Sequence, residues 1–211
     1  MREAVAATIA SAPVIGVVRT DSRDEAEGIA ATLIDGGIQF IEVTFTVPGA
    51  TDLVRRLLAE RGGPGPYWIG MGTVSGRERA ERAVAAGAEF VVTPNVDPDA
   101  AAVATAAGRY LIVGALTCTE IVAGRQLGAD LIKVYPLPPV GGPDYLATVR
   151  QPLGDIPMLA AGGFAVDEIP AYRAAGAVAF GIGQPLIGAG GEEARGRIAR
   201  ALALARGEAV S

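Results

Sequence analysis

The sequence predicts an α/β fold in which a single domain forms a closed (β/α)8 barrel. Short apolar runs recur about every 20–25 residues, and each is followed by a turn and an amphipathic segment that ends at glycine. Eight such runs suit a closed barrel, and 211 residues fit one unit of this kind. The alternative is an open, doubly wound sheet with a switch point. The barrel is favoured because no run has the character of an edge strand.

The eight apolar runs give the expected strands. They are Val14–Arg19, Phe40–Phe45, Trp68–Met71, Phe90–Thr93, Tyr110–Gly114, Leu131–Val134, Met158–Ala161 and Val178–Gly181. Helices are expected between them, among them Arg23–Ile34, Thr51–Glu60, Gly76–Ala86, Pro98–Ala107, Thr119–Leu127 and Val166–Ala175.

The ends of these helices carry consistent signals. Glycines that suit a positive φ after a helix stand at Gly36-Gly37, Gly87, Gly108, Gly128 and Gly176. Asp21-Ser22 precedes the first helix of the set, and Asp97-Pro98 places proline at an expected first helical position. Thr117 followed by Glu120 has the spacing of a capping box.

Charge and hydropathy restrict the partners. The net charge is −5 and the arginines are scattered, so the sequence predicts no nucleic-acid partner. Glycine, proline or charge interrupts every apolar run before the roughly 20 residues that a membrane span needs, and the N-terminus resembles no signal peptide. We therefore expect a cytoplasmic protein that acts on a small molecule and has no membrane partner.

The absence of histidine restricts the chemistry. Without imidazole, a Ser-His-Asp triad is excluded and a catalytic zinc site is disfavoured. The single cysteine, Cys118, lacks the usual base of a thiol nucleophile, and we expect it to be a small buried residue. The sequence thus predicts chemistry that uses no metal and no cofactor.

Lys133 is the only lysine of the chain, and it lies in the apolar stretch Ala129–Pro136. Arginine supplies the positive charge everywhere else, so this position suggests chemistry that a guanidinium cannot perform. A lysine amine can lose its proton and form a Schiff base with a carbonyl, whereas arginine stays protonated. The alternative is a structural lysine with a buried stem and a hydrated ammonium group.

Other polar residues fall at strand ends that a closed barrel brings to one mouth. Arg19 ends the first expected strand, Glu42 lies in the second, Thr73 follows the third and Thr93-Pro94-Asn95 ends the fourth. A 2-oxo acid substrate for Lys133 needs a cation for its carboxylate, for which Arg19 is the candidate. Glu42 stands between apolar neighbours and is the candidate acid/base. Its alternative role is a structural ion pair with an arginine.

Two glycine loops follow the last two expected strands. Gly162 and Gly163 come after the seventh, and Gly181, Gly183 and Gln184 mark the end of the eighth. Many barrels bind phosphate at this place through exposed backbone N–H groups. Simple turns are the alternative explanation of these glycines.

With these residues in view, the chain resembles the class I family of 2-keto-3-deoxy-6-phosphogluconate and 4-hydroxy-2-oxoglutarate aldolases. The resemblance is carried by Pro13–Arg19, Ile41–Thr44, Gly70–Val74, Leu131–Pro136 and Gly162-Gly163. It implies that Lys133 is the Schiff-base residue, that Glu42 is the acid/base and acts partly through water, and that Arg19 and Thr73 contact the pyruvoyl moiety. It also implies a homotrimer.

Departures from the family pattern bear on the substrate. Thr46 stands where many gluconate-type members have arginine, and Thr93-Pro94-Asn95 replaces their Ser-Pro-Gly. Both features resemble the 2-keto-3-deoxy-6-phosphogalactonate aldolase branch, which is therefore our first expectation. Ala161 and Gln184 replace a threonine and a serine that are common near the phosphate. A non-phosphorylated 2-oxo acid such as 4-hydroxy-2-oxoglutarate is accordingly the alternative substrate.

Two further hypotheses remain open at this point. One is a phosphate-binding isomerase or epimerase in which Glu42 abstracts a proton and Lys133 only stabilises an enolate, without a covalent adduct. The other is a barrel that binds 2-oxo acids but has lost turnover, which the altered Ala161 and Gln184 support. Release of pyruvate from a sugar acid separates both from an aldolase.

Overall fold

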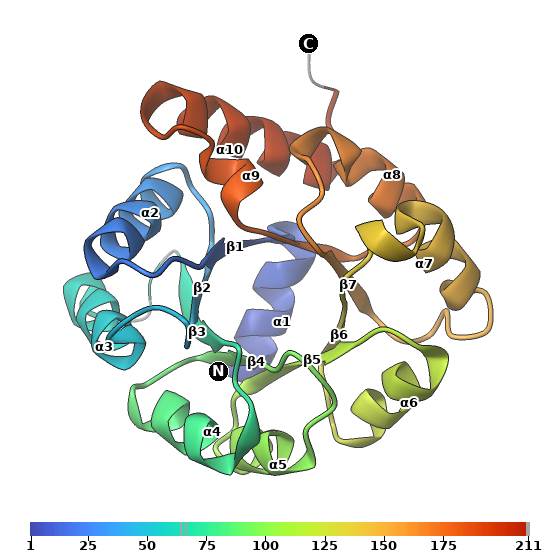
Figure 1. The fold of residues 1–211 in the computed structure, drawn as a ribbon, viewed down its shortest axis with the longest axis horizontal. Coiled ribbons are helices and arrows are strands. Elements are labelled where there is room, and N and C mark those ends of the chain that lie inside the picture. Colours follow the sequence, from blue (N-terminus) through green and yellow to red (C-terminus); the bar gives the residue numbers. More distant parts are fainter. Residues whose placement is uncertain (64, 66, 210–211) are drawn as a thin grey trace.

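The computed structural model describes residues 1–63, 65 and 67–209. Eight parallel strands form a closed barrel in the order β1 to β8, and a ring of helices surrounds it (Figure 1). The first and last strands pair directly, with Ile15 opposite Gly181. This pairing confirms the predicted barrel and contradicts the open sheet.

The strands begin and end within one residue of their predicted bounds. They are β1 (Val14–Val18), β2 (Phe40–Thr44), β3 (Trp68–Gly72), β4 (Phe90–Val92), β5 (Tyr110–Ala115), β6 (Leu131–Val134), β7 (Met158–Ala161) and β8 (Ala179–Ile182). Nearly every strand residue is buried. The strands of a barrel covered by helices are apolar on both faces, which is why continuous apolar runs locate them so well.

The helices of the ring follow the strands in alternation. They are α2 (Arg23–Asp35), α3 (Ala50–Arg61), α4 (Gly76–Ala85), α5 (Pro98–Ala106), α6 (Cys118–Gln126), α7 (Gly142–Arg150), α8 (Ile169–Ala174) and α10 (Gly191–Arg206), and a short α9 (Gln184–Ile187) precedes α10. Their predicted caps are confirmed. Ser22 accepts from the Glu25 amide, and Thr117 forms a capping box with Glu120. The glycine after α4, Gly87, has φ 89°.

Two predictions are wrong. The expected helix Val166–Ala175 is divided into a 3-10 turn, η2 (Val166–Glu168), and the α-helix α8. Pro170 lies in the first turn of α8, where its missing N–H group has no helical partner to lose. Cys118 is exposed rather than buried, because it occupies the first turn of α6 directly after the capping residue Thr117.

Helix α1 (Arg2–Ser11), which was not among the predicted helices, closes the N-terminal end of the barrel. Val5 and Ile9 are buried and pack in one cluster with inward-facing strand residues such as Phe40 and Phe90. Figure 1 shows α1 through the centre of the ring of strands. The opposite end of the barrel is therefore the open one.

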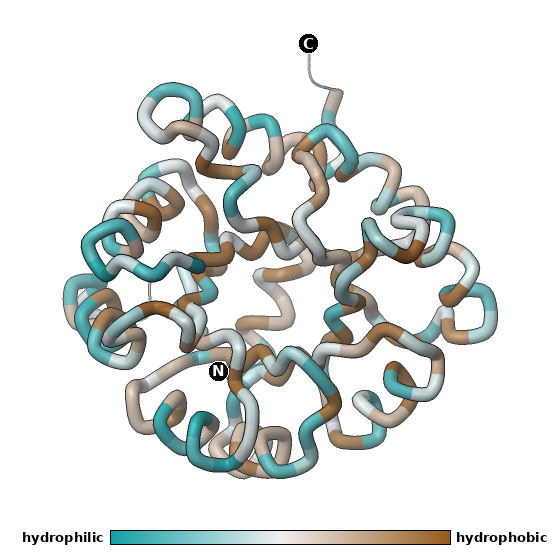
Figure 2. The backbone as a smooth tube through the Cα atoms, in the orientation of Figure 1, coloured by the Kyte–Doolittle hydropathy of each residue, from teal (hydrophilic) through white to brown (hydrophobic). Residues whose placement is uncertain are grey.

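Apolar side chains form two layers. The larger cluster lies between the strands and the surrounding helices, and the smaller one fills the barrel interior against α1. In Figure 2 the hydrophobic positions of the chain lie mostly toward the barrel, and the hydrophilic positions lie mostly on the outer helices. Within residues 1–63, 65 and 67–209, no helix is long and apolar enough to cross a membrane.

Candidate active site

The candidate site lies at the mouth where the parallel strands have their carboxyl ends. Lys133 comes from β6 and Glu42 from β2, and the two side chains meet inside the barrel with Lys133 Nζ 3.5 Å from Glu42 Oε1. A closed barrel is what brings these residues together across 91 positions of sequence. The sequence predicted that these two residues lie near each other only because it predicted a closed barrel.

Glu42 is enclosed almost completely, since only 1% of the residue is exposed. Within the described part of the chain, its Oε1 atom has no hydrogen-bond partner in normal geometry, and Lys133 at 3.5 Å is its nearest cation. A buried carboxylate without full hydrogen bonding is costly to the folded state. Such a group is a candidate for a role in chemistry rather than in stability.

Gly72 at the end of β3 provides the space for the Glu42 carboxylate. A Cβ atom at this position would stand 2.0 Å from Glu42 Oε1 and 2.6 Å from its Cδ. No other residue type leaves the carboxylate where it is. Gly72 was part of the motif that carried the family resemblance, but its steric role becomes visible only in the structure.

Lys133 is nearly as enclosed as Glu42, with 11% of its side chain exposed. Its Nζ atom lies 5.8 Å from the centre of the Tyr135 ring, within cation–π range. Gly114 pairs with Lys133 in the neighbouring strand, and a Cβ atom there would lie 2.4 Å from the carbonyl carbon of Pro94. The backbone after β4 therefore passes close beside the strand next to Lys133.

Arg19 and Thr73 form the second pair of the mouth. Arg19 Nη2 donates to Thr73 Oγ1 over 3.3 Å, and Arg19 is otherwise exposed. Thr73 has φ 58°, and it is the only non-glycine residue of the described chain with a positive φ. A β-branched residue in this region costs about 1–3 kcal/mol, and such strain is concentrated at functional sites.

A cavity of about 300 Å³ opens beside these pairs. It is lined by Val17, Arg19, Lys133, Tyr135, Ala161, Gly162, Gly163, Gly181, Gly183, Gln184 and Pro185. Seven of the predicted site residues are in this lining, and Glu42 and Thr73 join it through their contacts with Lys133 and Arg19. Val17, Tyr135 and Pro185 were not among the predicted site residues, although Tyr135 lies two residues after Lys133 and therefore near the same strand end.

Besides Glu42 and Thr73, three predicted residues lie outside the lining of this cavity. Thr46 is exposed and its hydroxyl lies 2.7 Å from that of Thr44. Asn95 and Pro94 are also exposed, and the Asn95 amide donates to the Val96 carbonyl over 3.3 Å. These residues stand after β2 and β4, on the same end of the barrel but outside the pocket.

The two glycine loops leave backbone donors free. The N–H groups of Gly162, Gly163, Gly183 and Gln184 donate to no backbone acceptor in the described chain beyond the regular ladders. Gly162 and Gly163 have φ 138° and 83°, so the turn after β7 depends on glycine. Pro185 contributes no N–H group, and Gln184 Nε2 is engaged by the Gly188 carbonyl at 3.2 Å. The donors available to an anion are thus mainly backbone amides.

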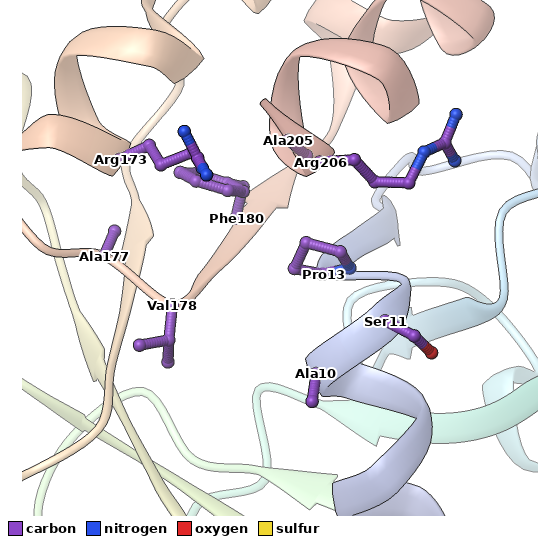
Figure 3. A pocket seen from close by; sticks show the side chains of 9 residues that line it. All are labelled: Ala10, Ser11, Pro13, Arg173, Ala177, Val178, Phe180, Ala205 and Arg206. Atoms are coloured by element: carbon purple, nitrogen blue, oxygen red, sulfur yellow. The ribbon is translucent and has the colours of Figure 1, made fainter. Parts of the chain in front are cut away.

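A second pocket, of about 260 Å³, lies at the opposite end of the barrel between α1, β8 and α10 (Figure 3). Pro13, Val178 and Phe180 belong to its lining, together with Arg173 and Arg206. Arg206 is paired with Glu208. This pocket contains none of the predicted site residues, and the mouth is therefore the candidate active site.

A family model described as KDPG and KHG aldolase matches residues 5–199, nearly the whole chain. The chain belongs to the KDPG and KHG aldolase family. Aldolases are carbon–carbon lyases, and the family match assigns the chain to this class of enzyme. No three His, Cys, Asp or Glu side chains of residues 1–63, 65 and 67–209 are grouped as metal ligands would be.

Individual relatives of this aldolase-family chain divide between two sugar acids. A probable 2-dehydro-3-deoxy-6-phosphogalactonate aldolase of Rhizobium meliloti is 32% identical over 175 residues, which cover 82% of this chain and 81% of the relative. A 2-dehydro-3-deoxy-phosphogluconate aldolase of Treponema pallidum is 31% identical, with 76% and 75% covered. A solved native KDPGal structure is 27% identical, with a TM-score of 0.81 and coverage of 92% and 93%.

Proposed function

We propose that the protein is a class I aldolase that cleaves a 2-keto-3-deoxy-6-phospho sugar acid into pyruvate and glyceraldehyde 3-phosphate. The phosphogalactonate substrate is the first choice, and the phosphogluconate epimer is the second. The observation that carries the proposal is the approach of the sole lysine to a buried carboxylate, at 3.5 Å, beside a cavity at the barrel mouth. An amine nucleophile and an acid/base within reach of one another are the two parts that a Schiff-base mechanism requires.

The reaction begins with the unprotonated Lys133 amine, which attacks the C2 carbonyl of the sugar acid. The carbinolamine loses water and leaves a protonated imine on Nζ. Glu42 accepts the proton of the C4 hydroxyl, the C3–C4 bond breaks, and its electron pair moves into the imine to form an enamine. The aldehyde leaves, the enamine takes a proton at C3, and water releases pyruvate and the free amine.

The remaining groups position the substrate. Arg19 offers a guanidinium for the C1 carboxylate, and Thr73 fixes one of its nitrogens at 3.3 Å. The free amides of Gly162, Gly163, Gly183 and Gln184 would receive the 6-phosphate. Thr46, Pro94 and Asn95 lie outside the cavity lining, and we assign them to the part of the sugar chain from the C4 hydroxyl to C6.

The preference for the galacto epimer is supported by Thr46, Asn95 and the likeness to the Rhizobium meliloti relative. The test is kcat/KM for both C4 epimers, each with and without the 6-phosphate, by coupled detection of pyruvate. We expect the galacto epimer to lead by about 5- to 150-fold, which corresponds to 1–3 kcal/mol for one mismatched hydroxyl. A clear preference for the gluco epimer would overturn this choice.

The second candidate substrate is a non-phosphorylated 2-oxo acid such as 4-hydroxy-2-oxoglutarate. It is favoured by the small number of side-chain donors at the two glycine loops. Ala161 has no hydroxyl, Pro185 has no N–H group, and the side-chain amide of Gln184 donates to the Gly188 carbonyl. Equal kcat/KM with and without the phosphate would support this candidate. Binding of 2-oxo acids without pyruvate release would instead indicate a non-catalytic barrel, and proton exchange without cleavage an isomerase.

We also propose that the protein is a homotrimer and acts in the cytoplasm. Support for the trimer comes from the family resemblance, and support for the compartment comes from the proposed metabolic substrate. Native mass spectrometry of the purified protein tests the assembly, for which a mass of three chains is expected. A monomer at micromolar concentration would contradict it.

A further inference from the structure

We infer that Arg79 of α4 is a positioning residue that holds Thr73 in its strained backbone conformation and thereby orients Arg19 for the substrate carboxylate. The inference rests on the proposed function, because it needs a carboxylate to be bound at Arg19. No motif of the sequence indicated a role for Arg79. It emerges from the contacts that surround the turn after β3.

Four hydrogen bonds restrain the turn from Thr73 to Gly76. The Val74 amide donates to the Val92 carbonyl over 3.1 Å, and the Gly76 amide donates to Asp97 Oδ2 over 2.6 Å. The carbonyl of Thr73 itself accepts from Arg79 Nη1 over 3.2 Å. The same nitrogen also reaches Ser75 Oγ at 3.1 Å. Arg79 therefore bridges the two ends of the segment in which Thr73 has φ 58°.

Phe45 keeps the Arg79 side chain in this place. The Arg79 guanidinium lies 5.6 Å from the centre of the Phe45 ring, and the Phe45 amide donates to the Gly72 carbonyl over 2.9 Å. Phe45 thus extends the pairing of β2 with β3 and presents its ring to α4. Arg82 approaches the same ring at 5.3 Å, but it makes no hydrogen bond to the Thr73 turn.

The consequence lies at the Thr73 hydroxyl. A threonine with positive φ returns to a more populated conformation when its restraints are removed, and its Oγ1 atom moves with the backbone. Arg19 Nη2 would then lose its partner at 3.3 Å. Arg19 is exposed and long, so it would bind the carboxylate less well without a fixed orientation.

The experiment compares Arg79→Met with Arg82→Met. Both substitutions remove one positive charge and one cation–π contact to Phe45, but only the first removes the hydrogen bond to Thr73. The affinities for pyruvate and for hydroxyacetone, a small ketone without a carboxylate, are measured by calorimetry on folded protein. We expect Arg79→Met to lower the affinity for pyruvate about 3- to 10-fold, which is the usual effect of one hydrogen bond, and to leave the affinity for hydroxyacetone unchanged. Arg82→Met should leave both affinities unchanged.

A double-mutant cycle with Arg19→Met gives the second readout. If Arg79 acts through Thr73 and Arg19, then Arg79→Met has no further effect on pyruvate affinity once Arg19 is removed. Steady-state kinetics should show the same split, with a raised KM and an unchanged kcat. Three results would each overturn the inference. They are losses of pyruvate affinity that add up in the double variant, a loss of hydroxyacetone affinity equal to that of pyruvate, and a loss of pyruvate affinity in Arg82→Met equal to that in Arg79→Met.

Failure of the proposed function has a different signature. Wild-type protein that binds pyruvate but forms no borohydride-stable adduct at Lys133 lacks the Schiff-base step. The affinity ratios of the Arg79 and Arg82 variants still decide the inference in that case. Wild-type protein that binds no pyruvate contradicts both.

Discussion

The two ends of the barrel differ in how their buried charged groups are hydrogen-bonded. At the N-terminal end, Arg61 and Glu89 are 8% and 7% exposed and form two hydrogen bonds of 2.8 and 2.9 Å. Glu89 also accepts from the Ile69 amide, and Arg61 donates to the Tyr67 carbonyl. At the mouth, Glu42 is more deeply buried, but its Oε1 atom has only Lys133 at 3.5 Å.

The backbone shows the same contrast. The N-terminal end is closed by α1, whose Arg2 binds Asp130 at 2.7 Å, while Asp130 also accepts from the Leu111 amide. The mouth contains the strained Thr73 and a glycine, Gly72, where any side chain would displace the Glu42 carboxylate. At the closed end the buried carboxylate of Glu89 is fully paired, although Arg61 Nε has no partner in the described chain, whereas at the mouth the buried carboxylate of Glu42 itself has an oxygen without a hydrogen bond, which suits its proposed role in chemistry.

Substitution of Glu42 by glutamine should have the largest effect on turnover. Loss of one acid/base group lowers kcat by about 10²–10⁴-fold, while the amide keeps the shape of the side chain and the protein stays folded. Steady-state kinetics and thermal unfolding of the variant measure the two effects separately. Wild-type turnover would remove Glu42 from the mechanism.

Arg61→Met should have the opposite profile. It leaves Glu89 buried without its cation, which costs about 3–5 kcal/mol of unfolding free energy. Arg61 lies at the far end of the barrel, so kcat of the protein that remains folded should not change. Chemical denaturation monitored by circular dichroism checks this, with Arg55→Met on the exposed face of the same helix as a control. A stability equal to that of the control would contradict the comparison.

Gly72→Ala tests whether space at the mouth is needed for activity. The new Cβ atom would displace the Glu42 carboxylate from a position 2.0 Å away. A displacement of about 1 Å can lower activity by about 10²-fold, and we expect that order of loss in kcat/KM. Gly28→Ala on α2, where a Cβ atom meets nothing within 4 Å, is the matched control. Full activity of Gly72→Ala would show that Glu42 does not need its present place.

The smallest effect is expected at high pH and concerns Tyr110 at the start of β5. Burial, with a further contribution from Asp130, raises the pKa of Tyr110 to about 12. Above about pH 10 the unfolded chain releases a proton that the folded chain retains, so the free energy of unfolding falls as pH rises toward 12. Urea midpoints at about pH 9 and about pH 11 should differ less in Tyr110→Phe than in wild type. An unchanged difference would mean that other groups cause the alkaline loss.

The sequence predicts the barrel well because its strands are apolar on both faces and its helices end at glycine. It does not name α1, in which only Val5 and Ile9 are buried, so that no broad apolar stripe marks the helix. It also does not name α7, whose first residues, Gly142-Pro143-Asp144, are typical of a turn. Helices whose place depends on distant contacts leave a weaker local signal than strands.

For the site, the sequence identifies the residue types but not their contacts. Lys133 is conspicuous because it is the sole lysine, and Glu42 because it interrupts an apolar run. The steric role of Gly72 and the bond from Arg79 to the Thr73 carbonyl depend on neighbours supplied by other units of the barrel. Thr46 and Asn95 were assigned to the substrate by resemblance. They lie outside the cavity lining, so in the proposed function they would contact the part of the sugar acid that extends beyond the cavity.

The most direct test of the account is covalent trapping of Lys133. Borohydride added with pyruvate should attach one reduced pyruvoyl group, and peptide mass spectrometry should locate it at Lys133, because the N-terminal amine is the only competing primary amine in the chain. Lys133→Arg should keep the positive charge, form no adduct and lose turnover. An unmodified Lys133 peptide, under conditions that trap an authentic class I aldolase, would contradict the Schiff-base mechanism.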